Sequence, residues 1–316
     1  ARVRYSTARG SISAISTDCS GFIWLATQSG TSRFDGKTNL KITFGKSKGN
    51  LQNYGSSSKL IYNNNSKQLL AYYSKYGIAA LNRTSNSYFF QQVPIFGLDV
   101  NLPLLFIDHM DQQYIIANAE SVYFFELNKN AILDLYKAEL DQKISEKDIY
   151  GVCKINNNTV AIISGINTLT TYKKNNSGLF IKTTQFILDL PENIKEIYSL
   201  NYYDKNYFVG TSKGLFQFSD TENAIKLTRK YIAQQAVYFT YKMYDSSIYV
   251  AGSNGLYLLD RNNNLNEIID NNNSNTNSYL STVYGIVADS NKVWLATQSG
   301  VAIFDHNGTP FSTVTG

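Results

Sequence analysis

Short apolar runs separated by polar turns extend along the whole chain. Ser11 to Ile15 alternates between polar and apolar residues, and Phe22 to Ala26 is a compact block rich in β-branched and aromatic side chains. Both patterns are typical of β-strands. The runs are separated by residues that favour tight turns, namely Asp18 to Gly21, Asn63 to Ser66, Asn156 to Asn158 and Asp245 to Ser247. The pattern therefore predicts an all-β chain made of hairpins.

One segment of this pattern occurs twice. The heptapeptide from Trp24 to Gly30 returns letter for letter from Trp294 to Gly300, and five weaker copies lie between them. Small or turn-forming residues mark the seven copies at Gly30, Gly77, Ser121, Asn167, Gly214, Gly255 and Gly300. The period of about 45 residues is that of a propeller blade.

The residue that marks each copy follows one apolar run and precedes another. We expect the glycines there to take a positive φ in a hairpin turn. Asn167 tolerates that conformation at modest cost, whereas Ser121 suits it less well.

Each repeat predicts three strands, and a fourth is inferred from runs such as Ile42–Phe44, Tyr88–Phe90, Phe186–Leu188 and Lys226–Thr228. Seven such units predict a seven-bladed β-propeller with four antiparallel strands per blade, formed as one domain over residues 1–316. Small residues four positions before the markers fit close packing between blades: Ala26, Ala117, Gly210, Ala251 and Ala296. Tyr73 and Ile163 depart from that pattern.

An open solenoid is the alternative for any repeat array. It usually needs atypical terminal repeats, whereas the first and last repeats here are the most alike, as adjacent blades of a closed ring would be. Either residues 2–6 or residues 311–314 supply the strand that completes the last blade. The sequence leaves this choice open.

Composition changes the picture only slightly. Aromatic residues make up 14% of the chain, which suits strands. Lys137 to Ile149 is expected to be a helical loop insertion. A net charge of +5 without a basic cluster argues against nucleic acid as a partner. Cys19 and Cys153 fall in the first and fourth repeats, so a disulfide between them is not expected.

No arrangement typical of a cofactor, metal or catalytic site is visible. His109 and His306 have no suitably spaced ligands, so neither a metal nor a cofactor is expected. The turn at Asp18 resembles the Asp-box of sialidases, with an extra residue before Gly21. If the chain were a glycosidase or lyase, the acids to examine would be those near loop ends: Asp99, Asp108, Glu120 and Asp148.

The run from Asp18 through Trp24, Gly30 and Arg33 to Gly36 resembles the two-component regulator propeller repeat. The segment from Asp289 to Asp305 is similar, with Lys292 and Ile303 replacing the turn glycine and the basic residue. The resemblance implies the N-terminal, periplasmic sensor propeller of a hybrid two-component system of the kind found in gut Bacteroidetes.

The same resemblance implies a non-catalytic domain that detects glycan fragments. Further propeller and immunoglobulin-like domains, a membrane span, a histidine kinase and a response regulator would follow it, and a homodimer is possible. The alternatives are a purely structural or dimerisation propeller, and a propeller hydrolase or lyase.

A ligand of such a propeller is expected at the loops after each second strand and at those leading into each first strand, because these loops share one face. The candidates on the first set of loops are Gln28, Tyr76, Glu120, Lys213, Asn254 and Gln298. Tyr150, Tyr198, Tyr238 and Tyr284 recur near the start of the first strand in repeats four to seven. Their phenols suit stacking on sugars, although packing between blades is the alternative. Trp24 and Trp294 are predicted to lie in the core.

Overall fold

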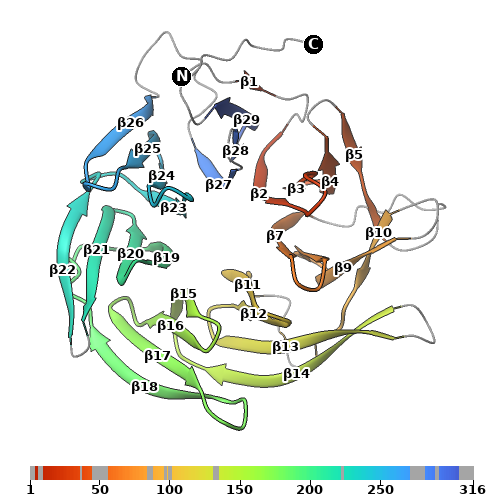
Figure 1. Ribbon diagram of the computed structural model, residues 1–316, viewed down its shortest axis with the longest axis horizontal. Helices are drawn as coiled ribbons and strands as arrows, with labels where there is room; N and C mark the ends of the chain where they lie inside the picture. The colour runs from red at the N-terminus through yellow and green to blue at the C-terminus, as the bar shows by residue number, and fades with distance from the viewer. Residues whose placement is uncertain are drawn as a thin grey trace. The chain divides into compact units, whose positions relative to one another are not determined.

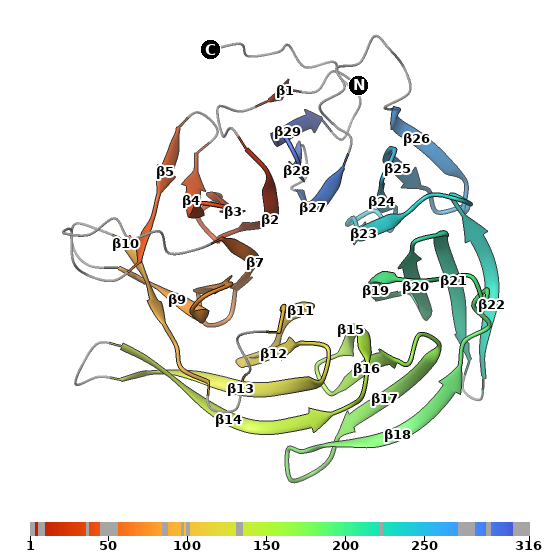
Figure 2. The same cartoon turned by 180° about the vertical axis from the view of Figure 1, so that it is seen from behind.

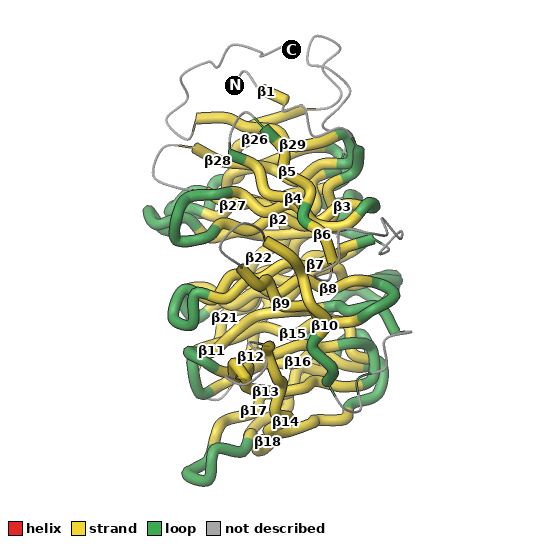
Figure 3. Tube along the Cα trace, turned by 90° about the vertical axis from the view of Figure 1, so that its right-hand side faces the viewer, coloured by secondary structure: helices red, strands yellow, loops and turns green. Residues whose placement is uncertain are grey.

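The computed structural model describes residues 4–5, 10–35, 38–44, 56–83, 88–95, 98, 102–130, 135–221, 224–270, 282–288 and 292–305. These residues form seven sheets, each with four antiparallel strands, which we number in chain order of the repeats, and the fold class is the seven-bladed β-propeller that the repeat predicts (Figure 1). The described part contains strands and loops but no helix (Figure 3). It therefore includes no helix that could cross a membrane.

The strands of the first three sheets follow one another along the chain. Sheet 1 consists of β2 (Ile12–Thr17), β3 (Ile23–Thr27), β4 (Gly30–Phe34) and β5 (Asn39–Lys41). Sheet 2 consists of β7 (Ser57–Asn63), β8 (Gln68–Tyr73), β9 (Gly77–Arg83) and β10 (Tyr88–Gln92), with β6 (Thr43–Phe44) added in parallel to β10. Sheet 3 consists of β11 (Phe106–Met110), β12 (Gln113–Ala117), β13 (Ser121–Asn130) and β14 (Leu135–Ser145).

The next three sheets have the same order of strands. Sheet 4 consists of β15 (Ile149–Asn156), β16 (Thr159–Ser164), β17 (Thr168–Lys174) and β18 (Phe180–Ile187). Sheet 5 consists of β19 (Ile197–Tyr203), β20 (Asn206–Thr211), β21 (Gly214–Thr221) and β22 (Ala224–Tyr231). Sheet 6 consists of β23 (Val237–Lys242), β24 (Ile248–Gly252), β25 (Gly255–Leu259) and β26 (Leu265–Asp270).

Sheet 7 combines the two ends of the chain. Its strands β27 (Val283–Ala288), β28 (Lys292–Thr297) and β29 (Gly300–Asp305) are completed by β1 (Arg4–Tyr5), which pairs with β29 in antiparallel fashion (Figure 2). The N-terminal segment thus supplies the strand that the sequence left open between two candidates. The C-terminal candidate, residues 311–314, lies outside the described residues.

The chain divides into two compact units. Unit 1 comprises residues 1–116, 123–143 and 284–316 and holds sheets 7, 1 and 2 with most of sheet 3. Ile12 and Leu25 of sheet 1 share a core cluster with Ala296 of sheet 7, so the first and last repeats are neighbours, as the closed ring predicts. Trp24 is buried against Phe90 of sheet 2, with ring centroids 6.5 Å apart. Trp294 is only half-buried, in contrast to the predicted core position.

Unit 2 comprises residues 117–122 and 144–283 and holds sheets 4, 5 and 6. Sheets 4 and 5 pack through Leu169 and Tyr207, among others, and sheets 5 and 6 through Phe208 and Val250. The expectation that residues 1–316 form one domain stays a prediction.

The local turn predictions agree with the structure at the glycines. Gly30, Gly77, Gly214, Gly255 and Gly300 all have positive φ, between 72° and 149°. The prediction for Asn167 is wrong. The turn before β17 is one residue longer than that before β4, and its positive φ values fall on Gly165 and Ile166 instead.

Two element predictions are also wrong. Lys137 to Ile149 is not a helical insertion, because β14 forms the outer strand of sheet 3 and buries Ile144. The run Ile42–Phe44 is not the fourth strand of sheet 1. The fourth strand of sheet 1 is β5. The Ile42 N–H donates to the Thr31 carbonyl at 3.0 Å, and the next two residues form β6, which pairs with β10 of sheet 2.

Candidate functional site

Within a sheet, the loop after the second strand lies beside the segment that leads into the first strand. Ser74 N–H donates to the Ser56 carbonyl in sheet 2, and Ser212 N–H donates to the Glu196 carbonyl in sheet 5. We call this side of a sheet its loop edge. The opposite side, where the first strand turns into the second, is the turn edge. The sequence predicts that the ten candidate ligand residues lie on or next to the loop edge.

The first strands of five sheets have a β-bulge at their second residue. In β15, β19 and β23 the register with the next strand skips one residue, and the skipped residues are Tyr150, Tyr198 and Tyr238. Ser13 and Ser58 occupy the same place in β2 and β7. A bulge leaves its extra residue unpaired and redirects its side chain. The recurrence of tyrosine seen in the sequence therefore coincides with a recurrent backbone irregularity.

Two of these tyrosines meet at the loop edge of unit 2. The rings of Tyr198 and Tyr238 lie 4.9 Å apart, centroid to centroid, with an interplanar angle of 59°. The Tyr198 hydroxyl donates a hydrogen bond to a carboxylate oxygen of Glu196, and 38% of the Tyr198 residue is exposed. Partial burial, assisted by this carboxylate, raises the pKa of Tyr198 to about 12. We call Glu196, Tyr198 and Tyr238 the tyrosine site.

The other predicted residues are not brought into this site by any contact described. Gln28 and Gln298 are exposed in their turns, Lys213 and Asn254 are half-buried, and 38% of Tyr284 is exposed. Tyr150 packs against the core between sheets 4 and 5. Tyr76 lies against Phe44, with ring centroids 5.0 Å apart. Glu120 is exposed, and its N–H donates to the Asn118 side chain.

The four acids considered for hydrolysis are spread over both units. Asp108 accepts the backbone N–H of His109 and belongs to unit 1, whereas Glu120 and Asp148 belong to unit 2 and are exposed. Asp99 and His306 lie outside the described residues. Within the described ranges, no three His, Cys, Asp or Glu side chains are grouped so that they could hold a metal ion.

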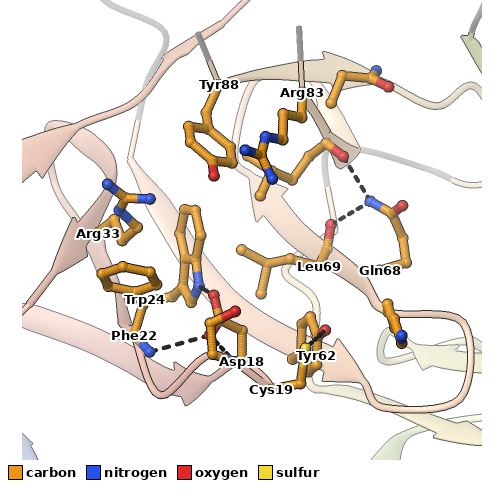
Figure 4. Close-up of a pocket in the computed structure, with 14 residues that line it drawn as sticks. Asp18, Cys19, Phe22, Trp24, Arg33, Tyr62, Gln68, Leu69, Arg83 and Tyr88 are labelled. Carbon is orange, nitrogen blue, oxygen red and sulfur yellow. Dashed lines mark hydrogen bonds between the residues drawn. The ribbon is translucent and has the colours of Figure 1, made fainter. Parts of the chain in front are cut away.

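A cleft of about 310 Å³ lies between sheets 1 and 2 of unit 1, on their turn edge (Figure 4). Its floor is organised by Asp18, whose Oδ1 accepts the N–H groups of Ser20 and Phe22 at 2.9 and 3.1 Å. The other carboxylate oxygen accepts the indole N–H of Trp24 at 2.8 Å. These three bonds fix the turn that precedes β3.

Two arginines line this cleft beside aromatic rings. The guanidinium carbon of Arg33 lies 4.2 Å from the centroid of Phe22 and 5.0 Å from that of Tyr88. The guanidinium carbon of Arg83 lies 5.4 Å from the Tyr88 centroid. We call this the arginine cleft. In the sequence Arg33 stands out only as part of a motif and Arg83 does not stand out, although both arginines lie near the end of the third strand in successive repeats.

Comparison with known proteins bears on the fold. No protein-family model matches the sequence, and no curated protein sequence matches it either. Among solved structures, similarity is found to the extracellular domain of BT3049 of Bacteroides thetaiotaomicron, assigned as a hybrid two-component system. The identity is 17% and the TM-score 0.70 over 98% of this chain and 42% of that one.

Two further structures are similar. The extracellular domain of BT4673 from the same organism, also assigned as a hybrid two-component system, is 18% identical, with a TM-score of 0.67 over 96% of this chain and 39% of that one. The WD40 propeller domain of Doa1 is 10% identical, with a TM-score of 0.69 over 98% and 99% of the two chains.

The chain therefore spans about two fifths of the two Bacteroides domains. At these identities the similarity concerns the fold, and the resemblance inferred from the repeat of Asp18 to Gly36 is confirmed at that level. The chain has the propeller fold that also occurs in the extracellular domains of Bacteroides hybrid two-component systems.

Proposed function

We propose that this chain is a non-catalytic sensor propeller from the extracytoplasmic, periplasmic part of a hybrid two-component system, and that it binds a glycan fragment. The observation that carries the proposal is the tyrosine site, in which two partly accessible phenol rings and a carboxylate meet at the loop edge of sheets 5 and 6. The similarity to extracellular domains of Bacteroides two-component systems supports this placement in the cell.

The chemistry of the tyrosine site suits a sugar. Aromatic rings offer flat apolar surfaces to the C–H groups of a pyranose, while phenol and carboxylate oxygens hydrogen-bond its hydroxyls. The Tyr198 pKa of about 12 keeps the phenol protonated throughout the physiological range, so its proton stays on the bond to Glu196 and its oxygen can accept a sugar hydroxyl. Glu196 supplies acceptors beside it.

The strands hold this site in place. Tyr198 and Tyr238 both stand at bulges of strands whose flanking residues Ile197 and Val237 are buried. Sites held on sheet strands are more rigid than sites held on mobile loops, so less ordering entropy is lost on binding. A rigid recognition surface is what a sensing domain requires.

The rest of the proposed receptor lies outside this chain. Because the chain spans about two fifths of the similar extracellular domains, further propeller and immunoglobulin-like domains, a homodimer and a kinase remain proposals drawn from the resemblance. The membrane-spanning and kinase steps are not assigned to any residue of this chain.

Calorimetric titration with a panel of neutral and acidic oligosaccharides tests the proposal. We expect one class of glycan to bind, and Tyr198→Ala to weaken binding about tenfold, the effect of losing one aromatic contact. Tyr244→Ala is the matched control, because Tyr244 is 89% exposed at the turn edge of the same unit. Absence of binding by any glycan, or equal loss in the control, contradicts the proposal. A glycan bound only by a longer ectodomain favours the structural alternative.

A further inference from the structure

The arginine cleft carries more positive charge than its own residues neutralise. Among the described residues that line it, Arg33, Arg83 and Lys67 are basic and Asp18 is the one carboxylate. Asp18 already accepts three hydrogen bonds, from Ser20, Phe22 and Trp24. Within the described part of the chain, neither arginine forms an ion pair, and the contacts found for both guanidinium groups are with aromatic rings. The cleft therefore has unused capacity to bind negative charge.

The two guanidinium groups lie against the same aromatic ring. Both lie within 5.4 Å of the centroid of Tyr88, and Arg33 lies over Phe22 as well. A guanidinium that rests on an aromatic face has lost part of its rotational freedom before a ligand arrives, and its N–H fork matches the oxygens of a carboxylate or sulfate. Two guanidinium groups that line one cleft give it a positive potential, which favours an anionic ligand.

The dimensions and walls of the cleft restrict the ligand further. Its volume of about 310 Å³ is at the lower end of the range for small-molecule sites, about 300–1,000 Å³. The walls combine the rings of Phe22 and Tyr88 with the side-chain oxygens of Tyr62 and Gln68 (Figure 4). The Tyr62 O–H already donates to Cys19 and the Gln68 amide N–H groups to backbone carbonyls, so these two side chains offer acceptors to a ligand. This mixture of aromatic and hydrogen-bonding groups suits a single polar ring that carries an anionic group.

We propose that the arginine cleft is a binding site for an oxyanion, the carboxylate or sulfate of a small acidic sugar, held by Arg33 and Arg83. The site lies in unit 1 and shares no residue with the tyrosine site, so either can fail without the other. The arginine cleft would be a second recognition surface, at the turn edge, whereas the ten candidates predicted from the sequence lie on or next to the loop edge.

Cys19 provides a direct probe of occupancy. Its thiol is exposed and lines the cleft, where the Tyr62 hydroxyl donates to Sγ at 3.1 Å, whereas Cys153 is buried and serves as the internal reference. The rate of iodoacetamide alkylation of Cys19 is measured by mass spectrometry with glucuronate, glucose 6-sulfate, inorganic sulfate or glucose present. At a ligand concentration of about ten times Kd, roughly a tenth of the sites stay free, so alkylation slows about tenfold.

We expect glucuronate or glucose 6-sulfate to protect Cys19, and glucose not to. Arg33→Gln and Arg83→Gln are expected to abolish protection, and Arg33→Lys to weaken it, because lysine keeps the charge but lacks the fork. Arg229→Gln, at an exposed position on β22, is the control and should leave protection unchanged. Circular dichroism spectra check that each variant is folded, and calorimetric titration should show weaker binding as salt is added.

Three results would overturn the proposal: no protection by any anion, equal protection by glucose, or full protection in both glutamine variants. Equal protection by inorganic sulfate supports the oxyanion site and identifies its occupant as a free anion instead of a sugar. Loss of glycan binding at the tyrosine site without any change at Cys19 would count against the proposed function alone.

Discussion

Replacing Gly210 by alanine tests why small residues stand where neighbouring sheets approach. A Cβ at this position of β20 would lie 2.4 Å from Ser199 Oγ and 2.6 Å from the carbonyl oxygen of Val237 in sheet 6. The serine side chain can rotate away, but the carbonyl belongs to the first strand of the next sheet. Overpacking of this kind costs about 1–3 kcal/mol. Alanine also lowers the conformational entropy of the unfolded chain, which raises the unfolding free energy by about 0.4–1 kcal/mol.

The net expectation for Gly210→Ala is a loss of about 1–1.5 kcal/mol in unfolding free energy, or roughly 2–5 °C in Tm. Gly285→Ala is the matched control, because its one tight contact would be with the Ile15 Cγ2 methyl group, at 3.3 Å, which can shift, while Ile15 N at 3.7 Å and Ala296 Cβ at 3.8 Å lie at ordinary contact distance. We expect that variant to stay within about 0.5 kcal/mol of wild type. Thermal unfolding followed by circular dichroism makes the comparison. Equal stability of the two variants would refute the packing argument.

Three further predictions concern polar groups. Asp18→Ala leaves the Trp24 indole N–H and two backbone N–H groups without their acceptor, so we expect a loss of about 2–3 kcal/mol in denaturant unfolding, and a smaller loss for Asp18→Asn, which keeps one acceptor. Asn63 is fully buried and its amide donates to the Asp111 carbonyl at 2.8 Å. Asn63→Ala should therefore lower the unfolding free energy by about 2–3 kcal/mol, whereas Asn64→Ala, at an exposed position, should stay near wild type. Similar Tm values for the two variants would contradict this expectation. Burial raises the pKa of Tyr207 above its unfolded value near 10. The contribution of Tyr207 to the unfolding free energy is therefore complete below pH 10 and falls above pH 10 by up to about 1.4 kcal/mol per pH unit. Alkaline denaturation curves should show a smaller slope for Tyr207→Phe.

The repeat and its turns were predictable because they depend on local chemistry. A glycine between two apolar runs implies a positive φ wherever a hairpin must reverse, and Gly30 and Gly214 have it. The turn before β17 was mispredicted because one additional residue moves the positive φ to Gly165 and Ile166. Periodicity does not register a single inserted residue.

The remaining differences come from contacts between segments far apart in the sequence. Lys137 and Ala138 favour helices intrinsically, but β14 becomes a strand because β13 offers an edge to pair with. The arginine cleft needs Arg33 and Tyr88, which stand in different repeats and meet only when sheets 1 and 2 pack. A β-bulge arises from the pairing of two strands, so the position of Tyr198 at a bulge could not be predicted from the sequence of its own strand.

The antiparallel pairing of β1 with β29 has a consequence for biosynthesis. Arg4 is synthesised about three hundred residues before its partner Ile303. The strands of each of sheets 4 to 6 follow one another in the chain and are all synthesised before Ile303, whereas sheet 7 needs both β1 and β29. Residues 4–5 therefore stay without their strand partner until β29 has been synthesised, and sheet 7 cannot be completed before that point.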